Sequence, residues 1–237
     1  MRWHRVNKDA GLPHLRHAVL RFVGTAIVPI FVFLALPICR GHAAEIAIEN
    51  SSIVIKGKLS RGDFVIFEKS IDLRYKTNQV IFENCLGGYV DEGVKIGELI
   101  RSKGLSTVAK GQVQSSCAYA YLAGGSRKFD EGFGVDLILL HATRNEDAEK
   151  DVASRANLAL IPYLQILSGG RLKPEILELI ARSTMPSQGV VFVHENWFFL
   201  NREKVLYCDG AQHRGLEKCT LLPHSDAFRE GIVTHRK

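Results

Sequence analysis

Ser115 lies at a corner of the chain where a serine could act as a nucleophile. The run from Leu105 to Ala109 is typical of a β-strand, a glycine-containing corner follows at Gly111, and the small and aromatic residues after Ser115 are typical of a buried helix. At the N-terminus of a helix, unpaired backbone N–H groups and the helix dipole favour developing negative charge. The sequence therefore predicts a hydroxyl at a place where an oxyanion could be stabilised.

His141 is the residue that best fits the base such a serine needs. It directly follows an apolar, strand-like run, 135–140, and comes 26 residues after Ser115. An imidazole can accept the proton of a serine when the two side chains come within hydrogen-bond distance. The remaining histidines lie in the first 42 residues, among late aromatic residues or in the polar C-terminal part. We therefore expect His141 to be the base.

A glycine pair, Gly87 and Gly88, follows the apolar run 79–83, which is typical of a buried strand. Glycines at a strand end can bring a backbone N–H close to a ligand, although an ordinary strand-to-helix turn is the simpler alternative. An amphipathic helix, 94–104, and the strand before Ser115 come next. The glycine loop and the Ser115 corner should therefore lie at the carboxyl ends of adjacent strands, where open α/β folds place their sites.

The elements that must position these residues alternate between strands and helices. Alternating apolar residues from 46 to 55 indicate strands that enter a sheet. Further helices are expected at 64–73, 146–167 and 174–182. Strand-like runs follow with a turn predicted at Asn201 and Arg202, and the polar tail from about residue 209 is expected to be loose. No repeat or low-complexity linker divides this part of the chain, so we predict a single α/β domain.

Residues 1–44 are expected to direct export. A basic stretch is followed by 17 uncharged residues, 22–38, and by small residues before Glu45. This order is typical of a signal peptide cleaved near Ala43 or Ala44, and an uncleaved membrane anchor is the alternative. We therefore predict that residues 45–237 form a domain in the periplasm, either free or anchored in the inner membrane.

The net charge of +6 does not indicate nucleic-acid binding. Residues 1–44 carry six basic residues and one acidic residue, which leaves the rest of the chain with a net charge of +1. A nearly neutral body lacks the basic surface that phosphate binding requires, so no nucleic-acid partner is expected.

Four cysteines follow residue 44, and export would favour disulfides between them over free buried thiols. Cys208 and Cys219 flank a polar loop and suit a local disulfide, whereas Cys85 and Cys117 are left without an assigned pairing. No CxxC pair occurs, and the spacings between cysteines and histidines are too irregular for zinc. Neither a metal nor a cofactor is expected.

The stretch STVAKGQVQSSCAYAYLAGG resembles the nucleophile region of the Clp protease proteolytic subunit. The arrangement is similar to little-characterised periplasmic ClpP-like proteins of bacteria, within the ClpP/crotonase superfamily. The motifs that carry the resemblance are Gly57 with Gly62-Asp63, Gly87-Gly88, and residues 111–115. The resemblance covers roughly residues 46–201 and implies an α/β spiral of ββα units. It also implies Ser115 as the nucleophile, His141 as the general base, and the N–H groups of Gly88 and Ser116 as the oxyanion hole.

The chain departs from the pattern of this family in three places, one of which is that Ser116 and Cys117 stand where small or flexible residues are more typical. Cys85-Leu86 replaces the usual Ser-Pro before the glycines. The third triad residue of the family, an aspartate, would fall near the end of the helix predicted at 174–182, where Ser183 and Thr184 stand instead. The alternatives are a Ser-His dyad, loss of activity, or another carboxylate such as Asp136, Asp147 or Asp151. The third member therefore stays unknown.

Two functions fit these residues. The first is an exported serine hydrolase, a peptidase in the simplest case, that forms an acyl-enzyme. The alternative is a catalytically inactive ClpP-like module for binding or assembly, while acyl-CoA chemistry of the crotonase kind is disfavoured by export. The resemblance implies a peptide or protein as substrate and a homo-oligomer as the assembly.

Overall fold

The computed structural model describes residues 43–72, 77–142, 150–185, 187–197, 200–210 and 215–235, which belong to one compact unit, 40–237. The predicted signal peptide or anchor, 1–44, lies outside the described residues apart from its last two. Among the helices in these ranges, none has both the length and the apolar character needed to cross a bilayer.

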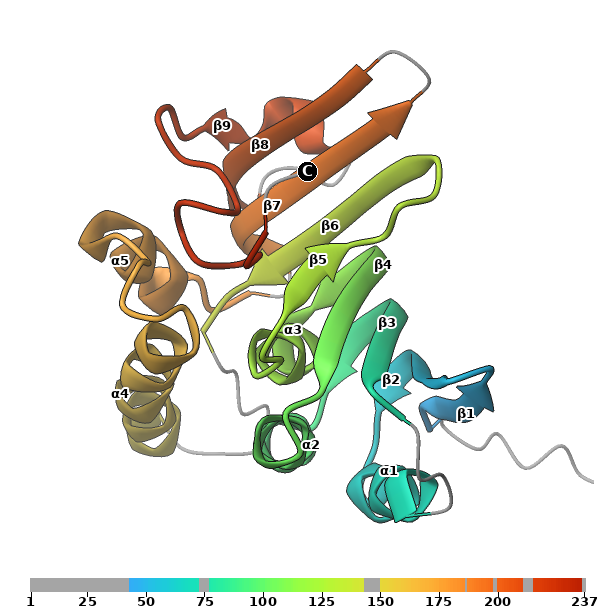
Figure 1. The fold of residues 1–237 in the computed structure, drawn as a ribbon. Helices are drawn as coiled ribbons and strands as arrows, with labels where there is room; N and C mark the ends of the chain where they lie inside the picture. Colours follow the sequence, from blue (N-terminus) through green and yellow to red (C-terminus); the bar gives the residue numbers. More distant parts are fainter. Residues whose placement is uncertain are drawn as a thin grey trace, which may run out of the picture. The chain divides into compact units, whose positions relative to one another are not determined.

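The described residues form a nine-stranded sheet with helices packed against it (Figure 1). The strands are β1 (Glu45–Glu49), β2 (Ser52–Leu59), β3 (Gln79–Gly88), β4 (Ser106–Gln114), β5 (Arg127–Phe129), β6 (Gly134–Leu140), β7 (Gln188–Trp197), β8 (Leu200–Asp209) and β9 (Thr220–Leu221). The helices are α1 (Asp63–Asp72), α2 (Val90–Ser102), α3 (Ser115–Leu122), α4 (Lys150–Leu167), α5 (Pro174–Arg182) and the short 3₁₀ helix η1 (Leu216–Lys218).

The sheet has the order β1-β2-β3-β4-β6-β7-β8-β9, and β5 also pairs with β4. Strands β2, β3, β4 and β6 run parallel, whereas β1 and the strands from β7 onward join antiparallel. The crossovers between the parallel strands carry α1 and α2, as βαβ units require. The predicted α/β class is confirmed.

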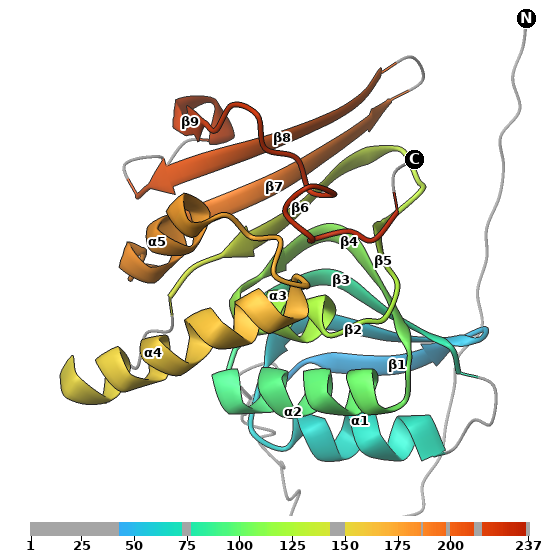
Figure 2. The same ribbon diagram turned by 60° about the vertical axis from the view of Figure 1, so that its left-hand side comes forward.

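Helix α3 lies at the centre of the packing, between the sheet and α2 (Figures 1 and 2). All of its residues after Ser115 are buried. Two glycines of α2 allow this close approach: a Cβ on Gly93 would lie 2.5 Å from the Ser116 carbonyl oxygen, and one on Gly97 would lie 3.2 Å from the Ala120 Cα. The sheet and α2 therefore fix the N-terminus of α3.

The turn predicted at Asn201 and Arg202 is wrong. Strands β7 and β8 pair along their whole length, from Gln188 opposite Asp209 to Trp197 opposite Leu200. Asn201 and Arg202 therefore both lie within β8. Polar side chains on an exposed hairpin suit either a turn or a strand, and pairing along its whole length decides in favour of the strand. The helix predicted at 146–167 is present as α4, but residues 143–149 lie outside the described part of the chain.

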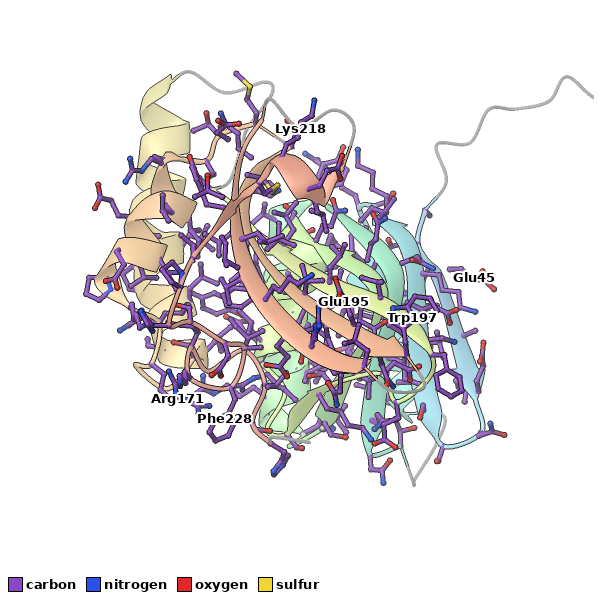
Figure 3. All side chains as sticks on the ribbon, turned by 90° about the horizontal axis from the view of Figure 1, so that it is seen from above. Glu45, Arg171, Glu195, Trp197, Lys218 and Phe228 are labelled. Carbon is purple, nitrogen blue, oxygen red and sulfur yellow. A yellow bond between two sulfur atoms is a disulfide. The ribbon has the colours of Figure 1, made fainter. Side chains whose placement is uncertain are left out.

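The C-terminal segment is packed rather than loose, so that expectation is also wrong. The Arg127 guanidinium donates to the carbonyl oxygens of Ile232 (3.1 Å) and Gly231 (2.8 Å), and the side chain of Ile232 is fully buried. Arg171 stacks over the ring of Phe228 at 5.3 Å, and the two labelled side chains lie together in Figure 3. A few apolar residues in a polar segment, joined to buried arginine donors, are enough to hold it against the domain.

Candidate active site

Three parallel strands end at one edge of the sheet, and each is followed by a residue that sequence reasoning singled out. Strand β3 ends at Gly88, β4 ends just before Ser115, and β6 ends just before His141. Since β4 pairs in parallel with both β3 and β6, these three ends lie side by side. The expectation that the glycine loop and the Ser115 corner share the carboxyl edge of adjacent strands is confirmed.

Ser115 has a backbone conformation that is costly for a residue with a side chain. Its φ is +52°, in the left-handed region, at the first residue of α3. Such strain of about 1 kcal/mol or more persists only where the surroundings impose it, and it is found at sharp strand-to-helix turns that expose a nucleophile. The side chain of Gln114 provides no cap for the first turn of the helix. The turn thus presents Ser115 on a helix N-terminus.

The glycine pair is required by close approaches on two sides, from Ser115 at Gly87 and from Leu59 at Gly88. Gly87 has a φ of +85°, and a Cβ built on it would lie 2.6 Å from the Cβ of Ser115 and 3.3 Å from its Oγ. Gly88 has a φ of +131°, and a Cβ there would collide with the backbone of Leu59. Both positions therefore need glycine for two separate reasons, conformation and space.

The end of β3 is tied to β2 beside the glycine pair. Tyr89 N–H donates to the Leu59 carbonyl oxygen at 3.1 Å, and Leu59 is the register partner of Gly88, where the ladder between the two strands is irregular.

A buried disulfide joins the glycine loop to α3. Cys85, two residues before Gly87, is bonded to Cys117, two residues after Ser115, and both cysteines are fully buried. The Gly87 N–H also donates to Cys117 Sγ at 3.2 Å. Sequence reasoning favoured disulfides but did not assign this pair, whereas the disulfide predicted between Cys208 and Cys219 is confirmed.

The corner before Ser115 is held by side chains from both neighbouring strands. Asn84, within β3, accepts the Gln112 N–H at 3.2 Å, and Asp136 of β6 accepts the Gly111 N–H at 2.6 Å. The ladder between β3 and β4 has a bulge here, and bulges recur beside active sites because they redirect a strand. Asp136 therefore braces the corner that leads to Ser115.

The His141 ring is buried, with 9% of the residue exposed. Its Nδ1 lies 2.7 Å from the carbonyl oxygen of Ala142. A carbonyl can only accept, so Nδ1 carries the hydrogen and Nε2 is the nitrogen able to take a proton. Burial lowers the pKa of His141 below its ordinary value of 6.5, and the bond to Ala142 offsets part of this effect.

Tyr119 joins the helix of Ser115 to the backbone of His141. Its hydroxyl donates to the carbonyl oxygen of His141, and the residue is fully buried. Burial raises the pKa of the Tyr119 phenol, and the nearby side chain of Ser115 opposes that rise. No hydrogen bond between Ser115 Oγ and the His141 ring occurs in the described part of the chain.

No carboxylate of the described residues hydrogen-bonds the His141 ring. Ser183, which stands where the resemblance puts the aspartate, is buried and donates from Oγ to the Leu179 carbonyl oxygen at 2.6 Å. Its own carbonyl oxygen accepts the Ala142 N–H at 2.9 Å. Thr184 is exposed, and of the alternative carboxylates Asp136 is engaged at Gly111, while Asp147 and the side chain of Asp151 lie outside the described residues.

Sequence reasoning missed Asn84, Tyr119 and Ala142. Asn84 could have been found, since a polar residue with strong turn preference ended a buried run beside the glycine corner. Tyr119 gave no such signal, because an aromatic residue in an apolar helix indicates core packing. Ala142 acts through its backbone, which no side-chain pattern reveals.

Comparisons with known proteins are limited to the fold. No protein-family model matches the sequence, and no curated protein sequence matches it. Among solved structures, ClpP1 from Listeria monocytogenes has a TM-score of 0.49 and 16% identity, covering 78% of this chain and 89% of that one. A mutant of the 1510-N membrane-bound stomatin-specific protease has a TM-score of 0.38 and 18% identity, covering 56% and 70%. At this identity the likeness concerns the arrangement of the elements and assigns no activity.

Proposed function

We propose that this chain is an exported serine hydrolase that acts on peptides or proteins, with Ser115 as the nucleophile and His141 as the general base. The observation that carries the proposal is the left-handed backbone of Ser115 beside Gly87, at the edge where three parallel strands end. A strained turn that exposes a hydroxyl next to a side-chain-free loop is costly, and it suits a nucleophile that must approach a bound carbonyl.

In the proposed reaction, Ser115 Oγ attacks the carbonyl carbon of the substrate while Nε2 of His141 takes its proton. The N–H groups of Gly88 and Ser116 stabilise the tetrahedral oxyanion, and each such donor is commonly worth about 10²- to 10³-fold in rate. The imidazolium then gives its proton to the leaving group, and water hydrolyses the acyl-enzyme by the same steps. Ser115 Oγ must come within hydrogen-bond distance of His141 Nε2, a tightening that in many enzymes accompanies substrate binding.

Export is supported by the two disulfides, since such bonds persist in oxidising compartments. The periplasm, a signal peptide or anchor at residues 1–44, and a domain from residue 45 onward complete this proposal. A peptide substrate and a homo-oligomeric assembly rest on the resemblance of the motifs around Gly87-Gly88 and Ser115.

A catalytically inactive binding or assembly module is the second candidate. It is favoured by one observation: the described residues contain no hydrogen bond from the Ser115 hydroxyl to the His141 ring, whose Nδ1 bonds to Ala142. An inactive module would keep this arrangement with a peptide bound, whereas an enzyme would not.

The test is covalent labelling of the oxidised protein by a fluorophosphonate probe. We expect labelling of the natural protein and its loss in Ser115→Ala and in His141→Ala. Ser106→Ala, at the opposite end of β4, and His235→Gln, at an exposed site, are the matched controls and should label normally. If the folded natural protein fails to label, the inactive module is the better account.

A further inference from the structure

We infer that the main-chain carbonyl of Ala142 orients His141 in place of a carboxylate, of which the described residues offer none to the ring, and that Tyr119 is the positioning residue that ties the preceding peptide unit, between His141 and Ala142, to the helix of Ser115. The inference rests on the proposed function of Ser115 and His141, and it addresses the part of the site that the sequence left unknown. Two hydrogen bonds and one buried position carry it.

The first step concerns the tautomer of the base. A triad carboxylate holds the imidazole with its hydrogen on Nδ1, and an amide at that position costs several orders of magnitude because the wrong tautomer results. A backbone carbonyl has no donor and cannot make this error. With Nδ1 at 2.7 Å from the Ala142 oxygen, the carbonyl selects the Nδ1–H form and leaves Nε2 as the acceptor.

The second step concerns what holds the backbone just before this carbonyl. Ala142 donates its N–H to the Ser183 carbonyl oxygen at 2.9 Å, where α5 ends. From the other side, the Tyr119 hydroxyl donates to the carbonyl oxygen of His141. The peptide unit between His141 and Ala142 is thus tied to α3 and to the end of α5. Ser183 therefore acts through its backbone: it anchors the residue whose own carbonyl contacts the ring.

The third step concerns what the carbonyl does not do. A carboxylate orients the imidazole and also stabilises the imidazolium that forms during the reaction, whereas a neutral carbonyl orients the ring with much less stabilisation of the charge. The buried ring therefore remains a neutral base at pH 7. The Ala142 carbonyl therefore orients the ring as a carboxylate would, but it stabilises the imidazolium much less.

Tyr119 has a close counterpart in the same helix, and the pair makes a matched test. Tyr121 is also fully buried, and its hydroxyl also donates to a backbone carbonyl, that of Lys128 at 3.3 Å. Removing either hydroxyl deletes one buried hydrogen bond of α3. Only the Tyr119 hydroxyl touches the residue that carries the base.

The first experiment reads the tautomer by ¹⁵N NMR of histidine-labelled, oxidised protein at pH 7.5, with the His141 signals assigned through His141→Gln. We expect Nδ1 to be protonated and Nε2 to be unprotonated. An Nε2–H tautomer, or rapid averaging between the two forms, would overturn the inference. This readout needs no catalysis, so it stands even if the proposed hydrolase fails to label.

The second experiment compares Tyr119→Phe with Tyr121→Phe by their maximal fluorophosphonate labelling rate and the same NMR signals. We expect Tyr119→Phe to lower the rate at least 10-fold and to admit the Nε2–H tautomer, while Tyr121→Phe keeps the natural rate and tautomer. Equal rates in the two variants, or faster labelling of Tyr119→Phe, would remove the positioning role. Absence of labelling in the natural protein would instead count against the proposed function.

Discussion

The two disulfides of this domain have the same chemistry in different structural roles. The bond between Cys85 and Cys117, the site disulfide, joins β3 to α3 beside Gly87 and Ser115 and is fully buried. The bond between Cys208 and Cys219, the edge disulfide, joins residues 11 positions apart at the end of the sheet. One couples two elements that must act together, and the other closes a local loop. We infer from this difference that the site disulfide fixes the position of the glycine loop relative to α3 and also stabilises the fold.

Chain entropy alone would hardly separate the two bonds. For sequence separations of 32 and 11 residues, the loop-closure relation gives about 3.7 and about 2.8 kcal/mol of stabilisation, respectively. The free energies of unfolding should therefore respond similarly when either bond is removed. Activity is the quantity that should distinguish them.

The largest effect is expected from Cys85→Ala with Cys117→Ala. Without the bond, the glycine loop can move relative to α3, and in the proposed mechanism this displaces the Gly88 N–H from the oxyanion. We expect the labelling rate to fall about 10²-fold, as for loss of one oxyanion donor. The measurement is fluorophosphonate labelling at a temperature where circular dichroism shows the variant folded. An unchanged rate in the folded variant would reduce the site disulfide to a stabilising bond.

A smaller effect is expected from Gly111→Ala, which alters the corner before Ser115 without touching a cysteine. An Ala here would have a left-handed φ and would collide with the Asn84 Oδ1 that accepts the Gln112 N–H. We expect about 3 kcal/mol of destabilisation and roughly 10-fold slower labelling. Urea unfolding and labelling rates check both values.

Gly104→Ala is the control for this variant. Gly104 has a φ of +62°, close to the +65° of Gly111, but a Cβ there meets nothing within 4 Å. It should therefore lose only the left-handed strain, about 1 kcal/mol, and should label normally. Equal losses of stability and of labelling rate in Gly111→Ala and Gly104→Ala would show that the contact with Asn84 does not stabilise the corner before Ser115.

The pH dependence of labelling and of stability tests the proposed role of His141, with a smaller expected effect. Burial lowers the pKa of His141 in the folded state, and the ring must be neutral to accept a proton. Labelling should therefore be level above pH 6.5 and should decline at lower pH, with its midpoint below 6.5. The stability that His141 contributes has the same sign: it is complete above 6.5 and is lost as pH falls toward the folded-state pKa, because the unfolded chain binds the proton first.

The variant His141→Ala separates this signal from other titrations. Urea unfolding measured between pH 5 and 8 should show a shallower decline of stability on the acid side for His141→Ala than for the natural protein. A labelling midpoint above 6.5 would contradict the buried, neutral base.

The smallest effect on activity is expected at the edge disulfide. Cys208→Ala with Cys219→Ala should cost about 2.8 kcal/mol of stability by the loop-closure relation. We expect its labelling rate to stay within about twofold of the natural rate, since these cysteines pack in a separate cluster with Leu139 and Leu206. A large loss of labelling here would remove the contrast between the two bonds.

The two disulfides also differ in whether the sequence could predict them. The edge disulfide was predictable because its cysteines are close along the chain and flank a polar loop. The site disulfide could be predicted only from the parallel pairing of β3 and β4, because this pairing is a long-range contact that no local sequence pattern indicates. The alternation of strands and helices, the Ser115 corner and the position of His141 after a strand were likewise local signals, and the fold places them at one edge of the sheet.

What escaped prediction depended on the backbone and on packing. The contact of His141 with the Ala142 carbonyl, the bracing of Gly111 by Asp136, and the packing of the C-terminal segment under Arg127 all join residues through main-chain groups. Asp136 was considered as a triad member because it is a carboxylate near His141 in sequence. The structure uses it at the far end of the same strand, where it accepts from Gly111.

The most direct measurement of the central claim is to locate the covalent label. The oxidised protein is treated with a fluorophosphonate, digested with both disulfides intact, and analysed by tandem mass spectrometry. The account predicts one phosphonylated residue, Ser115, in the peptide cross-linked between Cys85 and Cys117. A label on another residue, or no label on folded and fully oxidised protein, would contradict the assignment of Ser115 as a nucleophile.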